Sequence, residues 1–206
     1  MTFEEYYGEH LLRLKDMEQK LMNMIHQYPC QDTPEEVQPI IYCKSRIKRP
    51  DSMIAKLKSR GYPTDADTAL AQMHDVVGVR IVCSFIDDVY AISQWLHTQK
   101  EFEIITTKDY IAYPKPNGYR SLHKIIQFVQ GPEQGLTAEI QLRTIAIDFW
   151  AALEHQIKYK KNVEHEKTIQ KELKRCANEI ASVDLSMQTL RDFIRYDKWS
   201  DMGDSQ

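Results

Sequence analysis

The stretch VVGVRIVCSF (76–85) decides the fold, because it is almost continuously apolar and rich in valine and isoleucine. A short run of this kind predicts a strand buried in the centre of a sheet. A second stretch, LTAEIQLRT (136–144), alternates apolar and polar residues, as a strand with one buried face does. Three more candidate strands are IIYCKSRIK (40–48), FEIITTKDYI (102–111) and SLHKIIQFVQ (121–130). The sequence therefore predicts an α+β fold with a mixed β-sheet of about five strands.

Helical patterns flank these strands. Thr2 and Glu5 match a capping box, and an apolar stripe from Leu11 to Tyr28 predicts an N-terminal helix. Start and stop signals predict four further helices: from Pro50 to Gly61, over 68–73, from Asp87 or Asp88 to His97, and over 145–160. The predicted sheet is thus interspersed with helices that do not alternate regularly with its strands.

The segment after Val163 has the clearest helical periodicity. Its apolar residues recur at intervals of four and three: Ile169, Leu173, Cys176, Ile180, Val183, Met187, Leu190 and Ile194. Such a seam packs one helix against another, either within the domain or between subunits. We therefore divide the chain into a domain over 1–160 that includes the N-terminal helix, a helical extension over 161–198, and a disordered tail over 199–206.

Composition narrows the class of protein. The 206 residues carry a formal net charge of -3, and no apolar run approaches the roughly 20 residues of a membrane span. Sequence-independent binding of long nucleic acid usually requires a basic excess, so the net charge does not indicate RNA binding, although it leaves it open. The cysteines at positions 30, 43, 83 and 176 are scattered, as expected for reduced thiols in a cytoplasmic protein.

A basic cluster spans the first predicted strand and the helix after it. Lys44, Arg46 and Lys48 share one strand face, because side chains alternate along a strand. Ser52, Lys56 and Arg60 share one side of the helix, whose N-terminus offers free N–H groups. This arrangement suits a polyphosphate, although a solvated surface has the same pattern.

Two carboxylates occupy unusual positions. Asp75 directly precedes the apolar strand, and Glu139 lies within the alternating one. A buried acid needs a cation, a hydrogen-bond donor or a metal ion. Two carboxylates beside bound phosphates are typical ligands of Mg²⁺. The alternative is ordinary salt bridges, such as one between Glu139 and Arg143.

The loop YPKPNGYRSLH (113–123) is dense in groups that bind nucleotides. Lys115, Arg120 and His123 can contact phosphates, and Tyr119 offers a flat face for a base. Asn117-Gly118 indicates a turn, so a plain hairpin with exposed charges is the alternative.

Four stretches together resemble the synthetase domain of the RelA/SpoT family, and most closely its small, single-domain alarmone synthetases. They are SRIKRPDSMIAKL (45–57), HDVVGVRIVC (74–83), KDYIAYPKPNGYRSLH (108–123) and AEIQLRTIAIDFWAALEHQIKYK (138–160). The resemblance implies a nucleotidyltransferase-like sheet with flanking helices. It also implies transfer of the β,γ-pyrophosphate of ATP to the 3′-hydroxyl of GDP or GTP, giving ppGpp or pppGpp and AMP.

The resemblance assigns roles by motif position. Arg46 and Arg80 sandwich the adenine, and Lys48, Ser52 and Lys56 hold the ATP phosphates. Asp75 and Glu139 bind Mg²⁺, with Glu139 also acting as general base. Tyr119 stacks on the guanine, Lys115, His123 and Gln141 approach the acceptor, and Asp148 accepts hydrogen bonds from the guanine edge.

The resemblance also bears on assembly and on the acceptor. It implies a homotetramer, which favours the intersubunit interpretation of the C-terminal seam. The alternative function is the same pyrophosphate transfer to a tRNA 3′-end or an adenosine nucleotide. A nucleotidyl transferase that attacks the α-phosphorus and a non-catalytic RNA-binding protein are more distant alternatives.

Overall fold

The computed structural model describes residues 1–29, 38–159 and 166–203. Its centre is a five-stranded sheet with the strand order β1-β2-β5-β4-β3. The strands are β1 (Ile40–Ile47), β2 (Val77–Cys83), β3 (Phe102–Asp109), β4 (Leu122–Phe128) and β5 (Thr137–Thr144). The β2–β5 pair is parallel and the other three pairs are antiparallel. The predicted α+β fold with a mixed sheet is confirmed, and each strand lies within its predicted stretch.

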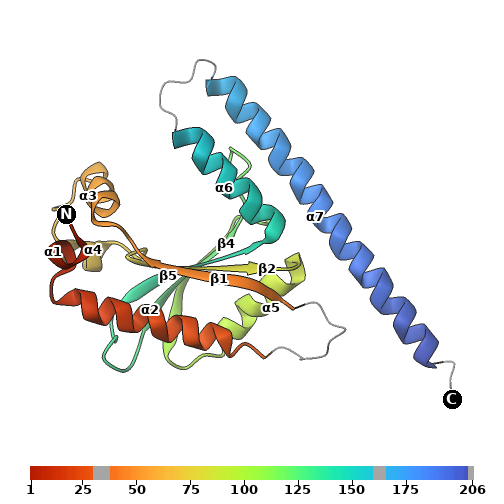
Figure 1. The fold of residues 1–206 in the computed structure, drawn as a ribbon, viewed down its shortest axis with the longest axis horizontal. Coiled ribbons are helices and arrows are strands. Elements are labelled where there is room, and N and C mark those ends of the chain that lie inside the picture. Colours follow the sequence, from red (N-terminus) through yellow and green to blue (C-terminus); the bar gives the residue numbers. More distant parts are fainter. Residues whose placement is uncertain (30–37, 160–165, 204–206) are drawn as a thin grey trace.

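Helices cover both faces of this sheet (Figure 1). They are α1 (Phe3–Tyr7), α2 (His10–His26), α3 (Pro50–Ser59), α4 (Ala66–Gln72), α5 (Ile86–Leu96), α6 (Ile145–Tyr159) and α7 (Glu166–Gly203). Helix α2 crosses one face, and α6 and α7 lie on the opposite side. The main core lies on the α2 side, where Leu14 and Leu21 join Val79, Ile81 and Ile140, all of them buried. The other face of the sheet is left for polar side chains.

The N-terminal helical region differs from the prediction in one respect. The capping box is present, because Thr2 N donates to Glu5 at 2.7 Å and Glu5 N donates to Thr2 at 3.1 Å. The helix that it starts ends at Tyr7, however, and α2 begins afresh at His10. Gly8 separates the two helices with φ +49, a conformation that an α-helix does not contain.

The seam of α7 divides into two halves. Leu173, Cys176 and Ile180 pack against Trp150 of α6 in a small second core. Met187, Leu190 and Ile194 continue the same spacing, but their side chains are 53–61% exposed. The first half of the seam therefore packs within the domain, and the second half has no partner among the described residues.

Helix α7 runs past the boundary that the sequence analysis placed after residue 198. It continues to Gly203, into the tail that was expected to be disordered from 199 onward. No helix-breaking residue precedes Gly203 in this segment, which explains the extension. Residues 204–206 and Cys30 lie outside the described residues, and the other three cysteines are free thiols. Within the described ranges, no helix is long and apolar enough to cross a membrane.

Candidate active site

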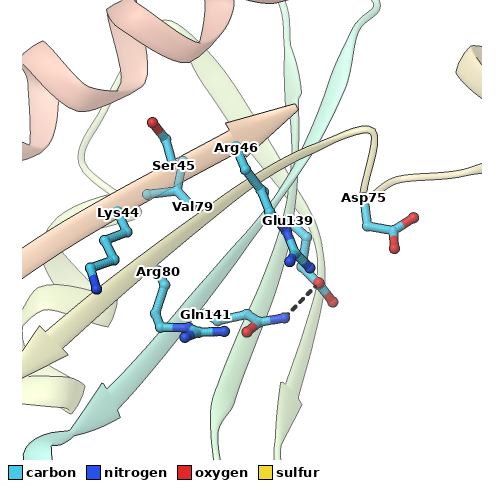
Figure 2. A pocket seen from close by; sticks show the side chains of 9 residues that line it. Lys44, Ser45, Arg46, Asp75, Val79, Arg80, Glu139 and Gln141 are labelled. Carbon is cyan, nitrogen blue, oxygen red and sulfur yellow. Dashed lines mark hydrogen bonds between the residues drawn. The ribbon is translucent and has the colours of Figure 1, made fainter. Parts of the chain in front are cut away.

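The strand register gathers polar side chains from across the sequence on one face of the sheet. Gly78 of β2 lies between Arg46 of β1 and Glu139 of β5, and Arg80 pairs with Gln141. A pocket of about 220 Å³ opens over these strands (Figure 2). Its lining residues are Lys44, Ser45, Arg46, Asp75, Gly78, Val79, Arg80, Glu139 and Gln141. Both predicted carboxylates and both predicted adenine-binding arginines therefore line the same pocket.

Gly78 keeps the floor of this pocket open. A Cβ atom placed on it would meet no atom within 4 Å, so the space above the strand is empty. Arg46 and Glu139 flank it in the register on either side. Any longer side chain at this position would enter the pocket. The glycine thus lets a flat or charged group lie directly against the sheet.

Asp75 is held by two of the predicted phosphate-binding lysines. Lys48 Nζ lies 2.6 Å from one carboxylate oxygen, and Lys56 Nζ lies 2.7 Å from the other. Burial raises the pKa of Asp75, but the hydrogen bonds from the two lysines outweigh it and hold the pKa below its usual value. Ser52 lies one turn before Lys56 on α3, with an exposed side chain that does not line the pocket.

Glu139 is the half-buried end of a hydrogen-bonded chain. Its Oε1 lies 3.0 Å from His123 Nδ1, and its Oε2 accepts from Gln141 at 2.8 Å. Burial raises the pKa of Glu139, but the hydrogen bond from His123 and that from Gln141 leave it below its usual value. The carboxylate is therefore ionised at neutral pH and can accept a proton or bind a cation. The charge of Asp75 acts on Glu139, as expected for two acids in one pocket.

Tyr119 continues this chain. Its hydroxyl lies 2.9 Å from His123 Nε2 and accepts from Arg143 at 2.7 Å. The ammonium of Lys115 lies 4.9 Å from the centre of the Tyr119 ring and 4.6 Å from that of Tyr110. Tyr119 thus contacts two other predicted acceptor residues, His123 and Lys115. The sequence analysis did not select Tyr110, although it lies within the same family-like stretch.

Asp148 lies in the first turn of α6 and contacts side chains from β1, β2 and β5. One oxygen contacts Arg143 at 2.9 Å and Arg80 at 3.2 Å, and the other accepts from Tyr42 at 2.6 Å. Burial raises the pKa of Asp148, but hydrogen bonds from Tyr42 and Arg143 lower it below its usual value. Arg143 pairs with Asp148 rather than with Glu139, its partner in the salt-bridge alternative. The alternation along β5 places Arg143 on the face of Glu139 and Gln141, a signal that could have identified it.

The two carboxylates fit a divalent cation that also binds phosphates. No group of three or more His, Cys, Asp or Glu residues within the described ranges could hold a metal on its own. Mg²⁺ commonly takes one or two carboxylates and completes its shell with substrate phosphates and water. Asp75 and Glu139 line one pocket, and the pKa of each is held below its usual value, so their carboxylates are compatible with such a donor set. Arg80 Nε is buried without a hydrogen-bond partner among the described residues, which further indicates that the pocket accommodates a polar ligand.

Comparisons with known proteins agree on one family. Residues 45–164 match the model of a region found in RelA / SpoT proteins. The chain is 46% identical over 142 residues to the GTP pyrophosphokinase YwaC of Bacillus subtilis (strain 168), covering 68% of each chain. It is 32% identical over 157 residues to the GTP pyrophosphokinase YjbM of the same organism, covering 74% of this chain and 72% of that one.

Solved structures show the same similarity. Small alarmone synthetase 1 from B. subtilis bound to its product pppGpp superimposes with a TM-score of 0.77 at 26% identity, covering 94% of this chain and 98% of that one. Small alarmone synthetase 2 from B. subtilis gives a TM-score of 0.74 at 37% identity, covering 90% and 97%.

Proposed function

The chain belongs to the RelA/SpoT family, and from this membership we propose that it is a GTP pyrophosphokinase that makes the alarmone of the stringent response. It transfers the β,γ-pyrophosphate of ATP to the 3′-hydroxyl of GDP or GTP, releasing AMP. The observation that carries the proposal is that Asp75, Glu139, Arg46 and Arg80 line one pocket. The curated relatives are GTP pyrophosphokinases, so transfer to tRNA or to an adenosine nucleotide is not favoured.

ATP lies between β1 and the floor of the pocket in this proposal. Arg46, the register partner of Gly78 on β1, and Arg80, two residues further along β2, both line the pocket, where an adenine ring can stack between guanidinium groups. Lys48 and Lys56 exchange the carboxylate of Asp75 for phosphate oxygens, and Ser52 contributes a hydroxyl from the first turn of α3. This exchange brings two positive charges to the β- and γ-phosphates.

Glu139 acts as the general base. It is ionised in the pocket, and its hydrogen bonds to His123 and Gln141 fix its orientation. It takes the proton of the acceptor 3′-hydroxyl while the oxygen attacks the β-phosphorus of ATP, and the bond to the AMP oxygen breaks. We propose that Asp75 and Glu139 hold Mg²⁺, which supplies positive charge to the phosphate oxygens.

The acceptor lies on the side of β4 and the 113–123 loop. Tyr119 is proposed to stack on guanine, while Lys115 and His123 contact acceptor phosphates and Gln141 lies beside the ribose. Asp148 can accept from guanine N1–H and N2–H, provided that it gives up contacts with Arg143 or Tyr42. Adenine lacks this pair of donors, so the same carboxylate would reject it.

We further propose that the enzyme is a homotetramer that works in the cytoplasm. The exposed apolar side chains at Met187, Leu190 and Ile194 of α7, and at Phe149 of α6, supply surfaces for contacts between copies. The free thiols of the described cysteines and the nucleotide substrates suit a reducing compartment. Light scattering of the wild type and of a Met187→Glu, Leu190→Glu variant tests the assembly: the wild type should have four times the chain mass, and the variant a lower mass.

Product analysis tests the activity. The protein is incubated with ATP and Mg²⁺ plus GDP, GTP, ADP or tRNA, and the products are identified by mass spectrometry. We expect AMP together with ppGpp or pppGpp, and no product with ADP or tRNA. Release of pyrophosphate, or pyrophosphorylation of tRNA, would contradict the proposal. Glu139→Gln is the matched control, which should abolish turnover while largely sparing ATP binding in a calorimeter.

A further inference from the structure

A second groove lies outside the ATP pocket, between the 113–123 loop and the N-terminal half of α7. Its volume is about 460 Å³, and its lining residues are Pro116, Asn117, Lys167, Gln170, Lys171 and Lys174. The three lysines follow at intervals of four and three, so they share one face of the helix. The loop and the helix are in close contact here, because a Cβ on Gly118 would lie 3.1 Å from Cα of Lys174.

The positive charge of this groove is not neutralised within the described part of the chain. Lys167, Lys171 and Lys174 take part in no ion pair there, and all three are exposed. The acids on the same stretch of α7 are engaged elsewhere, since Glu172 and Glu179 both pair with Arg175. Asn117 directs its amide to Glu154 of α6 at 3.0 Å, which fixes the loop wall of the groove. Three uncompensated cations in a concave site are suited to an oligophosphate.

The groove continues the line of the acceptor residues away from the general base. Glu139 contacts His123, His123 contacts Tyr119, and Lys115 lies over the Tyr119 ring. The chain then passes directly from Lys115 to Pro116 and Asn117, which line the groove. An acceptor with its 3′-hydroxyl at Glu139 and its base on Tyr119 extends its 5′-phosphates beyond the ribose. The groove follows the acceptor residues directly along the chain and carries three lysines.

We propose that Lys167, Lys171 and Lys174 bind the terminal 5′-phosphates of the guanosine acceptor, and that the groove thereby favours GTP over GDP. The inference rests on the proposed function and deepens it. Each added phosphate carries more negative charge toward the lysines. Affinity should therefore rise from GMP to GDP to GTP, and the increments should depend on the groove.

Charge reversal at two of these lysines tests the inference. KM and kcat are measured for GTP, GDP and GMP with saturating ATP, for the wild type and for the Lys171→Glu, Lys174→Glu variant. We expect the KM for GTP to rise about tenfold, that for GDP about threefold, and that for GMP less than about twofold. The kcat at saturating acceptor should stay unchanged. Lys15→Glu, an exposed reversal on α2, is the matched control and should change none of these values.

Direct binding separates this inference from the proposed function. Calorimetry without ATP measures the affinity of GTP and of GMP for the same proteins, and circular dichroism verifies that each variant is folded. If the wild type releases no AMP with any acceptor, the proposed function fails, and calorimetry still tests the groove. Equal KM changes for all three acceptors, or no change at all, would each overturn the inference.

Discussion

Lys48 Nζ donates a hydrogen bond to Oδ2 of Asp75 across 2.6 Å, although the two residues are 27 positions apart in the sequence. Lys56 contacts the other oxygen of the same carboxylate at 2.7 Å. Asp75 therefore holds both proposed phosphate-binding lysines. It competes with ATP for these lysines, and it is also a proposed metal ligand. The two roles make opposite predictions for its replacement by asparagine.

The Asp75→Asn variant should bind ATP more tightly without metal and yet lose activity with it. The amide no longer holds the lysine charges, so in EDTA the affinity for ATP should rise several-fold. In Mg²⁺, turnover should fall about 10²- to 10³-fold, because charge stabilisation in the transition state is lost. Calorimetry and AMP release measure the two effects. Asp16→Asn, an exposed change on α2, should affect neither, and weaker ATP binding by Asp75→Asn in EDTA would refute the competition.

Tyr119 offers a test that separates its ring from its hydroxyl. The hydroxyl contacts His123 and Arg143 in this structure, whereas the proposed role belongs to the ring. Tyr119→Ala should raise the KM for the acceptor about 5- to 150-fold, since stacking contributes roughly 1–3 kcal/mol per base. Tyr119→Phe should leave that KM within about twofold or lower it. Equal losses in both variants, measured by steady-state kinetics at saturating ATP, would assign the effect to the hydroxyl.

The periodicity of the sequence was sufficient to locate the strands and most helices. The apolar run of β2 and the alternation of β5 depend on local residue order alone, and their side chains point where that order predicts. The position of β5 between β2 and β4 depends on pairings such as that of Gly78 with Glu139, which no local pattern specifies. The break at Gly8 was missed because a single glycine is tolerated in many helical patterns.

The family-like stretches were sufficient to name the two carboxylates and the two arginines that line the pocket. They did not predict contacts that depend on how a helix lies against the sheet. The contact of Asp148 with Arg80 and Tyr42 requires α6 to cross the sheet at a particular position. Nothing in the spacing of these residues determines that position. The contact between the 113–123 loop and α7 was not predictable for the same reason. It depends on how α7, which is distant in sequence, packs beside the loop.

Gly118 is the residue of the 113–123 loop that packs against Lys174 and Ala177 of α7. A Cβ on it would lie 2.7 Å from Cβ of Ala177, and its φ is +89. Gly118→Ala should therefore displace the loop from the helix and raise the KM for the acceptor about tenfold or more, while that for ATP changes little. Gly135→Ala is the matched control, because Gly135 has φ +85 and a Cβ on it would meet no atom within 4 Å. Both variants should lose roughly 1–2 kcal/mol of stability from the backbone conformation, so a shared rise in the acceptor KM would contradict the packing argument.

We expect Asp184 to give the docking of α7 a pH dependence. This buried carboxylate accepts a hydrogen bond from Thr144 across 2.5 Å, and Thr144 in turn accepts from Ile147 N at the start of α6. Burial raises the pKa of Asp184, and the hydrogen bond from Thr144 opposes it only in part. A carboxyl whose pKa is higher in the folded than in the unfolded state stabilises the fold below its unfolded pKa, and this contribution is lost as pH rises through the folded pKa.

The Asp184→Asn variant should remove this dependence without removing the contact. Its amide oxygen can still accept from Thr144, and no charge is buried, so its free energy of unfolding above neutral pH should equal or exceed that of the wild type. Asp184→Ala leaves the Thr144 hydroxyl without this acceptor and should cost about 1–3 kcal/mol at every pH. Urea denaturation at fixed protein concentration, from pH 4 to pH 8, measures all three proteins. A wild type whose stability rises over this range relative to Asp184→Asn would show that the charged form of Asp184 is the one that the fold favours.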